Sequence, residues 1–301
     1  MARHRRTPWT TAQMPAQDGR RFVVTGATGG LGLELTRALA TAGADVVMAV
    51  RNTAKGELGA ERVRRTGARG RVEVRWLEVA DLGSVHAFAS NLDHADVLVN
   101  NAGIMAVPRS RTVDGFESQI GTNHLGHFAL TNLLLPRLSE RVVVVSSAWD
   151  RSGLLDVDDL GFERRGYAPY AAYAQSKLAN LLFLAELQRR LDAVGSPVRA
   201  TGAHPGYTAT GIHGGTGSRA FTRLGGLGNS LIGMKPSRGA LPLLYAATED
   251  LPGNSYVGPH GPGELLGRPT LVGRSDMAKD SDLADALWQR SESLTGVGFP
   301  D

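Results

Sequence analysis

A tyrosine and a lysine that could share a proton stand four positions apart in the segment YAQSK. Tyr173 and Lys177 occupy positions i and i+4 of a segment with helical spacing, so both side chains lie on one helix face. A tyrosine titrates near pKa 10, and exchange at neutral pH needs that pKa to fall by roughly 3 units. One ammonium about 4 Å away supplies about that much at an effective dielectric near 20. The spacing is therefore compatible with a phenol made labile by an amine, with Tyr173 as acid/base; an ordinary helix pair is the alternative, and without further motifs it is the commoner one.

A glycine-rich turn, TGATGGLG, directly follows the first β-branched run. Gly26, Gly30 and Gly32 stand in a G-x-x-x-G-x-G spacing. Glycine lets the backbone turn tightly and approach a pyrophosphate closely. A helix that begins near Gly30 would direct its free N–H groups and the positive end of its dipole at that anion. A tight turn that binds nothing is the alternative, but the position between a strand and a helix favours a phosphate site.

Alternating strands and helices must position these groups. Val-rich runs with little polar alternation are typical of strands covered on both faces, and they stand at residues 21–25, 45–50, 71–77, 96–100, 141–147 and 197–204. Leucines at helical spacing lie between them, for example over residues 31–39 and 178–191. We therefore expect an α/β fold, a single Rossmann-type doubly wound parallel sheet with helices on both faces. A last strand over 254–259 and helices over 237–248 and 282–294 complete the prediction.

The chain is expected to hold one domain with a basic leader. Residues 1–21 contain five arginines and one aspartate, which account for the whole formal net charge of +4. We expect residues 1–18 to be a flexible basic extension and residues 19–301 to be the domain, with a glycine-rich substrate lid at about 206–234. Because residues 22–301 are neutral overall, a nucleic-acid partner is not expected.

Composition excludes several kinds of site. The chain has no cysteine, which rules out a disulfide scaffold and a thiol nucleophile. No run of about 18 apolar residues and no secretory leader is present, so we expect a cytoplasmic protein without a membrane span. His124 and His127 lack a third ligand at a usual spacing, and the acids at 156–159 lack a calcium-loop pattern. No metal site is predicted.

The set of motifs resembles the short-chain dehydrogenase/reductase family. TGATGGLG is followed, in the family's order, by NNAG at 100–103, SS at 146–147, YAQSK at 173–177 and HPG at 204–206. Longer phrases resemble the retinol-dehydrogenase-like branch, namely TNHLGHF at 122–128, YAQSKLANLLF at 173–183 and LWQRSESLTGV at 287–297. The resemblance covers about residues 20–297.

The resemblance implies roles for four side chains. Ser147 and Tyr173 would hydrogen-bond the substrate oxygen, and Lys177 would tune Tyr173 and bond the nicotinamide ribose. Asn123 would support a proton relay through a water. Ser146 is expected to bond only to backbone.

The same motifs imply contacts with a dinucleotide. Besides Tyr173 and Lys177, the predicted cofactor-binding residues are Gly26, Thr28, Gly30, Leu31, Gly32, Arg51, Asn52, Glu78, Val79, Asn101, Ala102, Gly103, Pro205, Gly206, Thr208 and Thr210. For the adenine contact, Glu78 and Asp81 remain alternatives.

The end of the second strand favours NADP(H) over NAD(H). Val50 stands where an NAD-preferring protein usually places an acid for the ribose 2′-hydroxyl, and Arg51 follows. An arginine can bind a 2′-phosphate with two hydrogen bonds, and Lys55 could assist.

The predicted function is that of an NADP(H)-dependent oxidoreductase, which interconverts a carbonyl compound (a ketone or an aldehyde) and an alcohol by hydride transfer. A non-catalytic dinucleotide-binding regulator on the same fold is the alternative. The expected partner is a small-molecule carbonyl or alcohol, and the resemblance suggests a homodimer or homotetramer.

Overall fold

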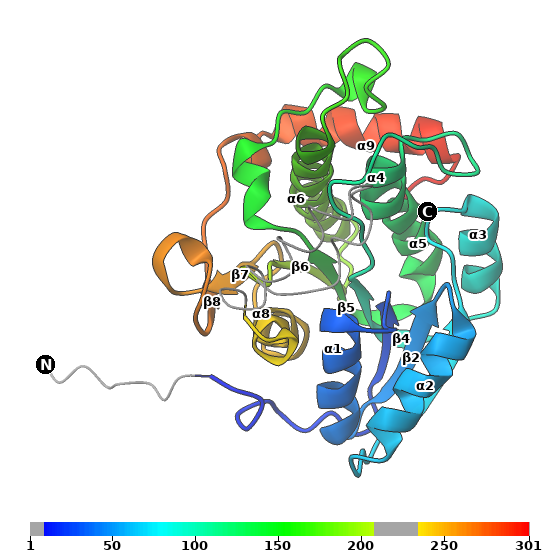
Figure 1. The fold of residues 1–301 in the computed structure, drawn as a ribbon, viewed down its shortest axis with the longest axis vertical. Coiled ribbons are helices and arrows are strands. Elements are labelled where there is room, and N and C mark those ends of the chain that lie inside the picture. The colour runs from blue at the N-terminus through cyan, green and yellow to red at the C-terminus, as the bar shows by residue number, and fades with distance from the viewer. Residues whose placement is uncertain (1–8, 208–233, 301) are drawn as a thin grey trace, which may run out of the picture.

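The computed structural model describes residues 9–207 and 234–300 (Figure 1). In this part of the chain, eight strands form one sheet in the order β3-β2-β1-β4-β5-β6-β7-β8. The strands are β1 Arg21–Thr25, β2 Asp45–Val50, β3 Val72–Trp76, β4 Ala95–Asn100, β5 Leu138–Val145, β6 Arg199–Ala203, β7 Tyr256–Pro259 and β8 Pro269–Leu271. β1 pairs in parallel with both β2 and β4. The strand order therefore reverses beside β1, where ligands of such sheets bind beyond the carboxyl ends of the strands.

Helices cover both faces of the sheet, as predicted. One face carries α1 Gly30–Thr41, α2 Thr53–Arg64 and α8 Pro236–Thr248. The other carries α3 Leu82–Ser90, α5 Gly126–Leu134 and α6 Pro169–Ala193, with α9 Ser281–Thr295 lying beside α6 (Figure 1). Continuous apolar runs such as Phe22–Val24, which are fully buried, supply apolar side chains to both layers. No described helix is long and apolar enough to cross a bilayer.

Short helical segments connect these elements. They are α4 Ser118–Ile120, the π-helical turn η1 Gly121–Leu125, and the 3-10 turns η2 Leu135–Arg137, η3 Ala148–Ser152, η4 Val157–Asp159, η6 Pro262–Glu264 and η7 Met277–Lys279. The π-helical turn runs directly into α5, so α4, η1 and α5 form one interrupted helical segment.

The predicted doubly wound parallel sheet is present, but the expectation that 254–259 is its last strand is wrong. β7 is followed by β8, which pairs with it antiparallel, so that Val257 lies opposite Leu271. Three residues are too few to show an alternating pattern, and Pro269 is tolerated because β8 stands at the edge of the sheet.

The segment before β1 differs from its prediction as well. Residues 9–18, expected to belong to a flexible extension, pack against the domain. The Trp9 indole donates to Glu249 at 2.8 Å, and its ring meets Tyr245 edge-on with 5.2 Å between centroids. Gln17 is fully buried, and its N–H donates to Ala42 O at 2.9 Å. An apolar indole and a satisfied amide therefore hold this segment in place.

Most of the predicted lid lies outside the described residues. Within 206–234 only Gly206, Tyr207 and Met234 are described. The N–H of Met234 donates to Tyr207 O at 2.9 Å, which joins the two ends of the segment.

Candidate functional site

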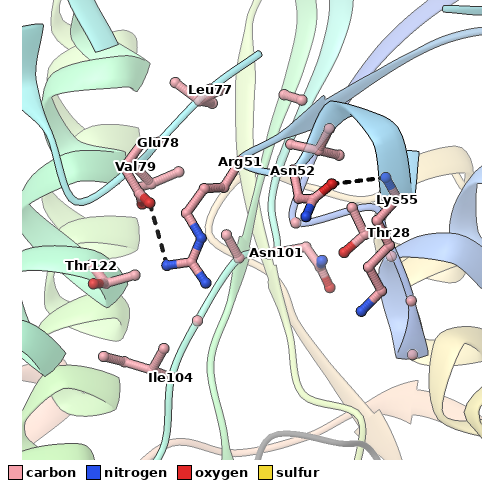
Figure 2. Close-up of a pocket in the computed structure, with 18 of the residues that line it drawn as sticks. Thr28, Arg51, Asn52, Lys55, Leu77, Glu78, Val79, Asn101, Ile104 and Thr122 are labelled. Carbon is pink, nitrogen blue, oxygen red and sulfur yellow. Dashed lines mark hydrogen bonds and ion pairs between the residues drawn. The ribbon is translucent and has the colours of Figure 1, made fainter. Parts of the chain in front are cut away.

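A cavity of about 560 Å³ opens at the carboxyl ends of β1, β2, β3 and β4, where the strand order reverses. It is lined by Gly26, Thr28, Gly29, Gly30, Leu31, Gly32, Ala49, Val50, Arg51, Asn52, Lys55, Leu77, Glu78, Val79, Asn101, Ala102, Gly103, Ile104 and Thr122 (Figure 2). All twelve predicted cofactor contacts from Gly26 to Gly103 are among these residues, so four separate loops meet here.

The turn after β1 can be built only with glycine at two positions. Gly26 has φ +67°, and a Cβ there would lie 2.9 Å from Ala102 Cα. A Cβ on Gly32 would lie 2.6 Å from Gly26 O. The first residues of α1 have no side-chain cap, because the N-cap residue is Gly29. Free N–H groups and a floor without side chains fit the pyrophosphate of a dinucleotide.

Thr25 ties the glycine turn to the end of β4. Its hydroxyl accepts the N–H groups of Asn101 and Ala102 at 2.9 and 2.8 Å, and its carbonyl accepts the Asn101 amide at 2.7 Å. The hydroxyl also contacts His127 Nε2 at 3.0 Å, while His127 Nδ1 lies 3.2 Å from Asn123 O. Burial lowers the pKa of His127 to about 4, so Nδ1–H donates to the carbonyl and Nε2 accepts from Thr25.

Charged groups gather at the end of β2. Arg51 Nη1 lies 3.3 Å from Glu78 Oε2, and the arginine side chain is 78% exposed. Asn52 caps α2 by accepting the N–H of Lys55 at 2.8 Å. Of the two acids left open for the adenine contact, Glu78 lines the cavity. Asp81 caps α3 instead, because its carboxylate accepts the Ser84 N–H at 3.2 Å.

Three of the predicted catalytic side chains meet beside this cavity. Tyr173 and Lys177 share one face of α6, and Ser147 at the end of β5 hydrogen-bonds the Tyr173 hydroxyl. Lys177 Nζ lies 5.7 Å from the centroid of the Tyr173 ring and donates to Val145 O at 3.3 Å. The expected backbone role of Ser146 is present, since its hydroxyl donates to Lys177 O at 2.7 Å and joins β5 to α6.

Burial, rather than the neighbouring amine, dominates the protonation of this cluster. Burial raises the pKa of Tyr173 to about 12, against a smaller lowering by the Ser147 hydrogen bond. Burial likewise lowers the pKa of Lys177 to about 8. The expectation that the ammonium alone lowers the phenol's pKa is therefore wrong. The attraction between one ammonium and one phenolate at a dielectric near 20 is opposed by the cost of removing both charged groups from water.

Asn123 connects the reactive cluster with the cavity. It lies fully buried in the π-helical turn, where its amide donates to Ile104 O and Ser176 Oγ, both at 2.9 Å, and its carbonyl accepts the Ile104 N–H at 2.9 Å. A Cβ on Gly103 would stand 3.1 Å from Asn123 Oδ1 and 3.6 Å from Lys177 Nζ. The side chain thus holds the segment that separates the two regions, and its relay role remains a prediction.

The remaining predicted contacts lie elsewhere. Pro205 and Gly206 follow β6 and do not line the cavity; a Cβ on Gly206 would lie 2.4 Å from Leu265 O. Thr208 and Thr210 lie outside the described residues. Sequence reasoning missed several lining residues, namely Gly29, Ala49, Leu77, Ile104 and Thr122. Each of them stands within two positions of a predicted site residue, so nearness to a motif in the sequence is the signal that could have found them.

His124, the first histidine of TNHLGHF, packs against α9 and α6. His124 Nε2 lies 2.8 Å from Ser291 Oγ of α9, and burial lowers its pKa to about 3. Its ring meets Phe183 edge-on. Across residues 9–207 and 234–300, no three histidines or acids are placed to hold a metal ion.

Comparisons with known proteins agree with this geometry. A sequence model described as short chain dehydrogenase matches residues 20–219. The chain belongs to this family. It is 40% identical to the polyprenol dehydrogenase of Mus musculus, over 96% of this chain and 87% of that protein. It is 38% identical to the human retinol dehydrogenase 13, over 94% of this chain and 86% of that protein. The chain therefore lies in the retinol-dehydrogenase-like branch of the short-chain dehydrogenases.

A solved structure supports the fold of this short-chain dehydrogenase. An uncharacterised protein from Mycobacterium paratuberculosis is 52% identical and superposes with a TM-score of 0.85, covering 98% of this chain and all of the other. The family's proteins are oxidoreductases that bind a nicotinamide dinucleotide, and the glycine cradle beneath the uncapped α1 is suited to that cofactor.

Proposed function

We propose that this short-chain dehydrogenase interconverts a carbonyl and an alcohol by hydride transfer with NADP(H), using Tyr173 as acid/base. The observation that carries the proposal is the Ser147–Tyr173 hydrogen bond, with Lys177 on the same helix face as Tyr173 and close to Gly103, which lines a cavity suited to a dinucleotide. A proton donor thus stands next to the place where the cofactor's reactive end would lie.

The direction of proton transfer follows from the protonation of Tyr173. With a pKa of about 12, the phenol is protonated at neutral pH and can donate to a carbonyl oxygen. Ser147 would orient that oxygen by donating a second hydrogen bond. The bound dinucleotide supplies or accepts the hydride. For alcohol oxidation Tyr173 must first lose its proton and then accept the proton of the alcohol.

The NADP(H) preference rests on the charges at the end of β2. Arg51 and Lys55 line the cavity there, and β2 ends with Val50 where a ribose-binding acid would stand. Two cations, with no acid at the end of β2 itself, favour the extra phosphate of NADP(H) over the bare hydroxyl of NAD(H).

The substrate we propose is an apolar alcohol or the corresponding carbonyl compound. The two relatives are named for polyprenol and retinol, both of which are apolar alcohols. In this chain Trp149 and Tyr170 stack with 5.6 Å between centroids and are 43% and 45% exposed. They stand two residues after Ser147 and three before Tyr173, so an apolar surface adjoins the reactive hydroxyls.

The test is carbonyl-dependent oxidation of NADPH over a panel of apolar aldehydes and ketones. Tyr173→Phe should lower turnover at least about a hundredfold. The melting temperature of the variant, and the increase of that temperature when NADPH is added, should stay nearly unchanged. Tyr245→Phe on α8 is the matched control, because it removes a tyrosine hydroxyl away from the cavity.

Two results would contradict the proposal. Wild-type turnover by Tyr173→Phe would remove Tyr173 as proton donor. Binding of NADPH without turnover of any carbonyl would favour the alternative, a dinucleotide-binding regulator.

A further inference from the structure

The cation that would meet a 2′-phosphate already has an anionic partner in this protein. Arg51 Nη1 lies 3.3 Å from Glu78 Oε2, between the end of β2 and the loop after β3. Both residues line the cavity, and 27 positions separate them in the sequence. In Figure 2 the guanidinium points across the cavity toward Glu78, whereas Lys55 lies on the side of Asn52 and Thr28. The pair therefore holds Arg51 away from the second cation of the predicted phosphate site.

The two members of this pair are held very differently. Glu78 is fixed by its own loop, because Oε1 accepts the Ala80 N–H at 3.2 Å and its N–H donates to Ser84 Oγ at 2.8 Å. Its side chain is 24% exposed. Arg51 is 78% exposed, and its guanidinium makes one hydrogen bond to the described residues, the one to Glu78. Arg51 can therefore turn away while Glu78 keeps its backbone contact and its access to water.

We propose that Glu78 sets the cofactor preference of this protein by competing with the 2′-phosphate of NADP(H) for Arg51. The inference rests on the proposed use of NADP(H). A carboxylate and a phosphate offer the guanidinium similar acceptor oxygens. While Arg51 is paired with Glu78, it cannot also make two parallel hydrogen bonds to the 2′-phosphate. NAD(H) has no phosphate at this position, so its binding does not require the Arg51–Glu78 pair to open. Glu78 is thus a specificity-determining residue that weakens NADP(H) binding selectively.

Substitution of the carboxylate isolates this effect. Glu78→Gln keeps the size of the side chain and an oxygen for the Ala80 N–H, but removes the charge that holds Arg51. We expect the affinity for NADP⁺ to rise about twofold to fivefold, as suits the loss of one exposed charge pair. The affinity for NAD⁺ should change less than about twofold. Isothermal titration of the full chain with NADP⁺ and NAD⁺ measures both without any substrate.

A matched control and a double variant make the test specific. Glu57→Gln removes the same charge from α2. Glu57 does not line the cavity, is 57% exposed and pairs with Arg64 at 3.5 Å. This variant should change neither the NADP⁺ nor the NAD⁺ affinity. In an Arg51→Gln background, Glu78→Gln should no longer tighten NADP⁺ binding, because its effect acts through Arg51. The same tightening in that background would show direct repulsion of the phosphate and would overturn the inference.

Other outcomes separate this inference from the proposed function. Weaker NADP⁺ binding by Glu78→Gln would mean that Glu78 orients Arg51 for the phosphate, and equal changes for both dinucleotides would mean that it has no part in specificity. Either result overturns the inference and leaves the oxidoreductase intact. A wild-type protein that binds neither dinucleotide would instead overturn the proposed function.

Discussion

The two ends of the site are built from different parts of the protein. The end at Gly26 and Gly32 consists of backbone, and its shape follows from the close approach of the turn to Ala102. The end at Ser147, Tyr173 and Lys177 consists of buried side chains whose protonation is displaced in opposite directions. One end recognises its ligand by shape and N–H groups, and the other depends on charges removed from water.

This difference separates what each end needs in order to act. The phosphate end is complete as folded, because an uncapped helix start and a bare turn need no proton to bind an anion. At the reactive end, Tyr173 is protonated, and the pKa of Lys177 is lowered by burial to about 8. Variants should therefore act on binding at the first end, and on proton transfer and stability at the second.

The largest expected effect is on the backbone-built end. In Gly32→Ala the new methyl group would lie 2.6 Å from Gly26 O and 2.8 Å from Asn101 Nδ2, so the turn must open. We expect dinucleotide affinity to fall at least about a hundredfold, which corresponds to about 2.7 kcal/mol, as measured by isothermal titration. Gly273→Ala, where an added Cβ meets nothing within 4 Å, is the control. Affinity within about threefold of wild type would show that the close approach is not required.

A smaller effect should appear in stability when the buried amine is removed. Burial lowers the pKa of Lys177 in the folded protein to about 8, below its usual 10.5. The unfolded chain therefore binds more protons between these values, and the amine costs stability below pH 8. Lys177→Met should lose activity yet gain about 1–3 kcal/mol of unfolding free energy at pH 7. That gain should shrink as the pH rises from 8 to 10.5.

Chemical denaturation at pH 7 and pH 10 measures this change. Val145 O keeps a partner in the variant, because Asn180 Nδ2 donates to it at 3.0 Å. Lys279→Met, at a side chain 58% exposed, should leave stability and its pH dependence nearly unchanged. A Lys177→Met protein less stable than wild type at pH 7 would mean that the amine is a net stabilising contact.

The smallest effect concerns the apolar rim of the reactive end. Trp149→Ser removes the partner of Tyr170, and we expect the KM for an apolar carbonyl to rise about threefold to tenfold. The dissociation constant for NADPH should stay within about twofold, since Trp149 does not line the dinucleotide cavity. Leu58→Ser, an exposed apolar side chain of α2, is the control. A change in NADPH affinity without a change in KM would place Trp149 at the wrong end of the site.

The sequence predicted where chemistry occurs better than how its groups are charged. Strand ends and helical spacing placed Ser147, Tyr173 and Lys177 together because these relations are local or follow from a parallel sheet. The Tyr173 pKa depends on burial by many distant residues, which no spacing contains. The Arg51–Glu78 pair joins two loops that lie 27 positions apart in the sequence, and no local pattern links them.

Elements of the fold divide in the same way. The Val-rich strands were found because their apolar runs are continuous, and β8 was missed because it has three residues and contains Pro269. The packing of Trp9 on α8 depends on a contact across 240 positions. The basic, polar composition of residues 1–18 indicates a flexible extension and contains no sign of that contact. The π-helical turn at Asn123 leaves no pattern that differs from an ordinary helix.

Transfer of deuterium from labelled NADPH tests the central claim most directly. In a single turnover with NADPH that carries deuterium at both C4 positions, the wild-type protein should place one deuterium on the carbonyl carbon of an apolar aldehyde or ketone. Tyr173→Phe should bind the same NADPH with similar affinity and transfer the label at least about a hundredfold more slowly. Transfer at the wild-type rate by Tyr173→Phe, or no transfer to any carbonyl by the wild-type protein, would contradict the account.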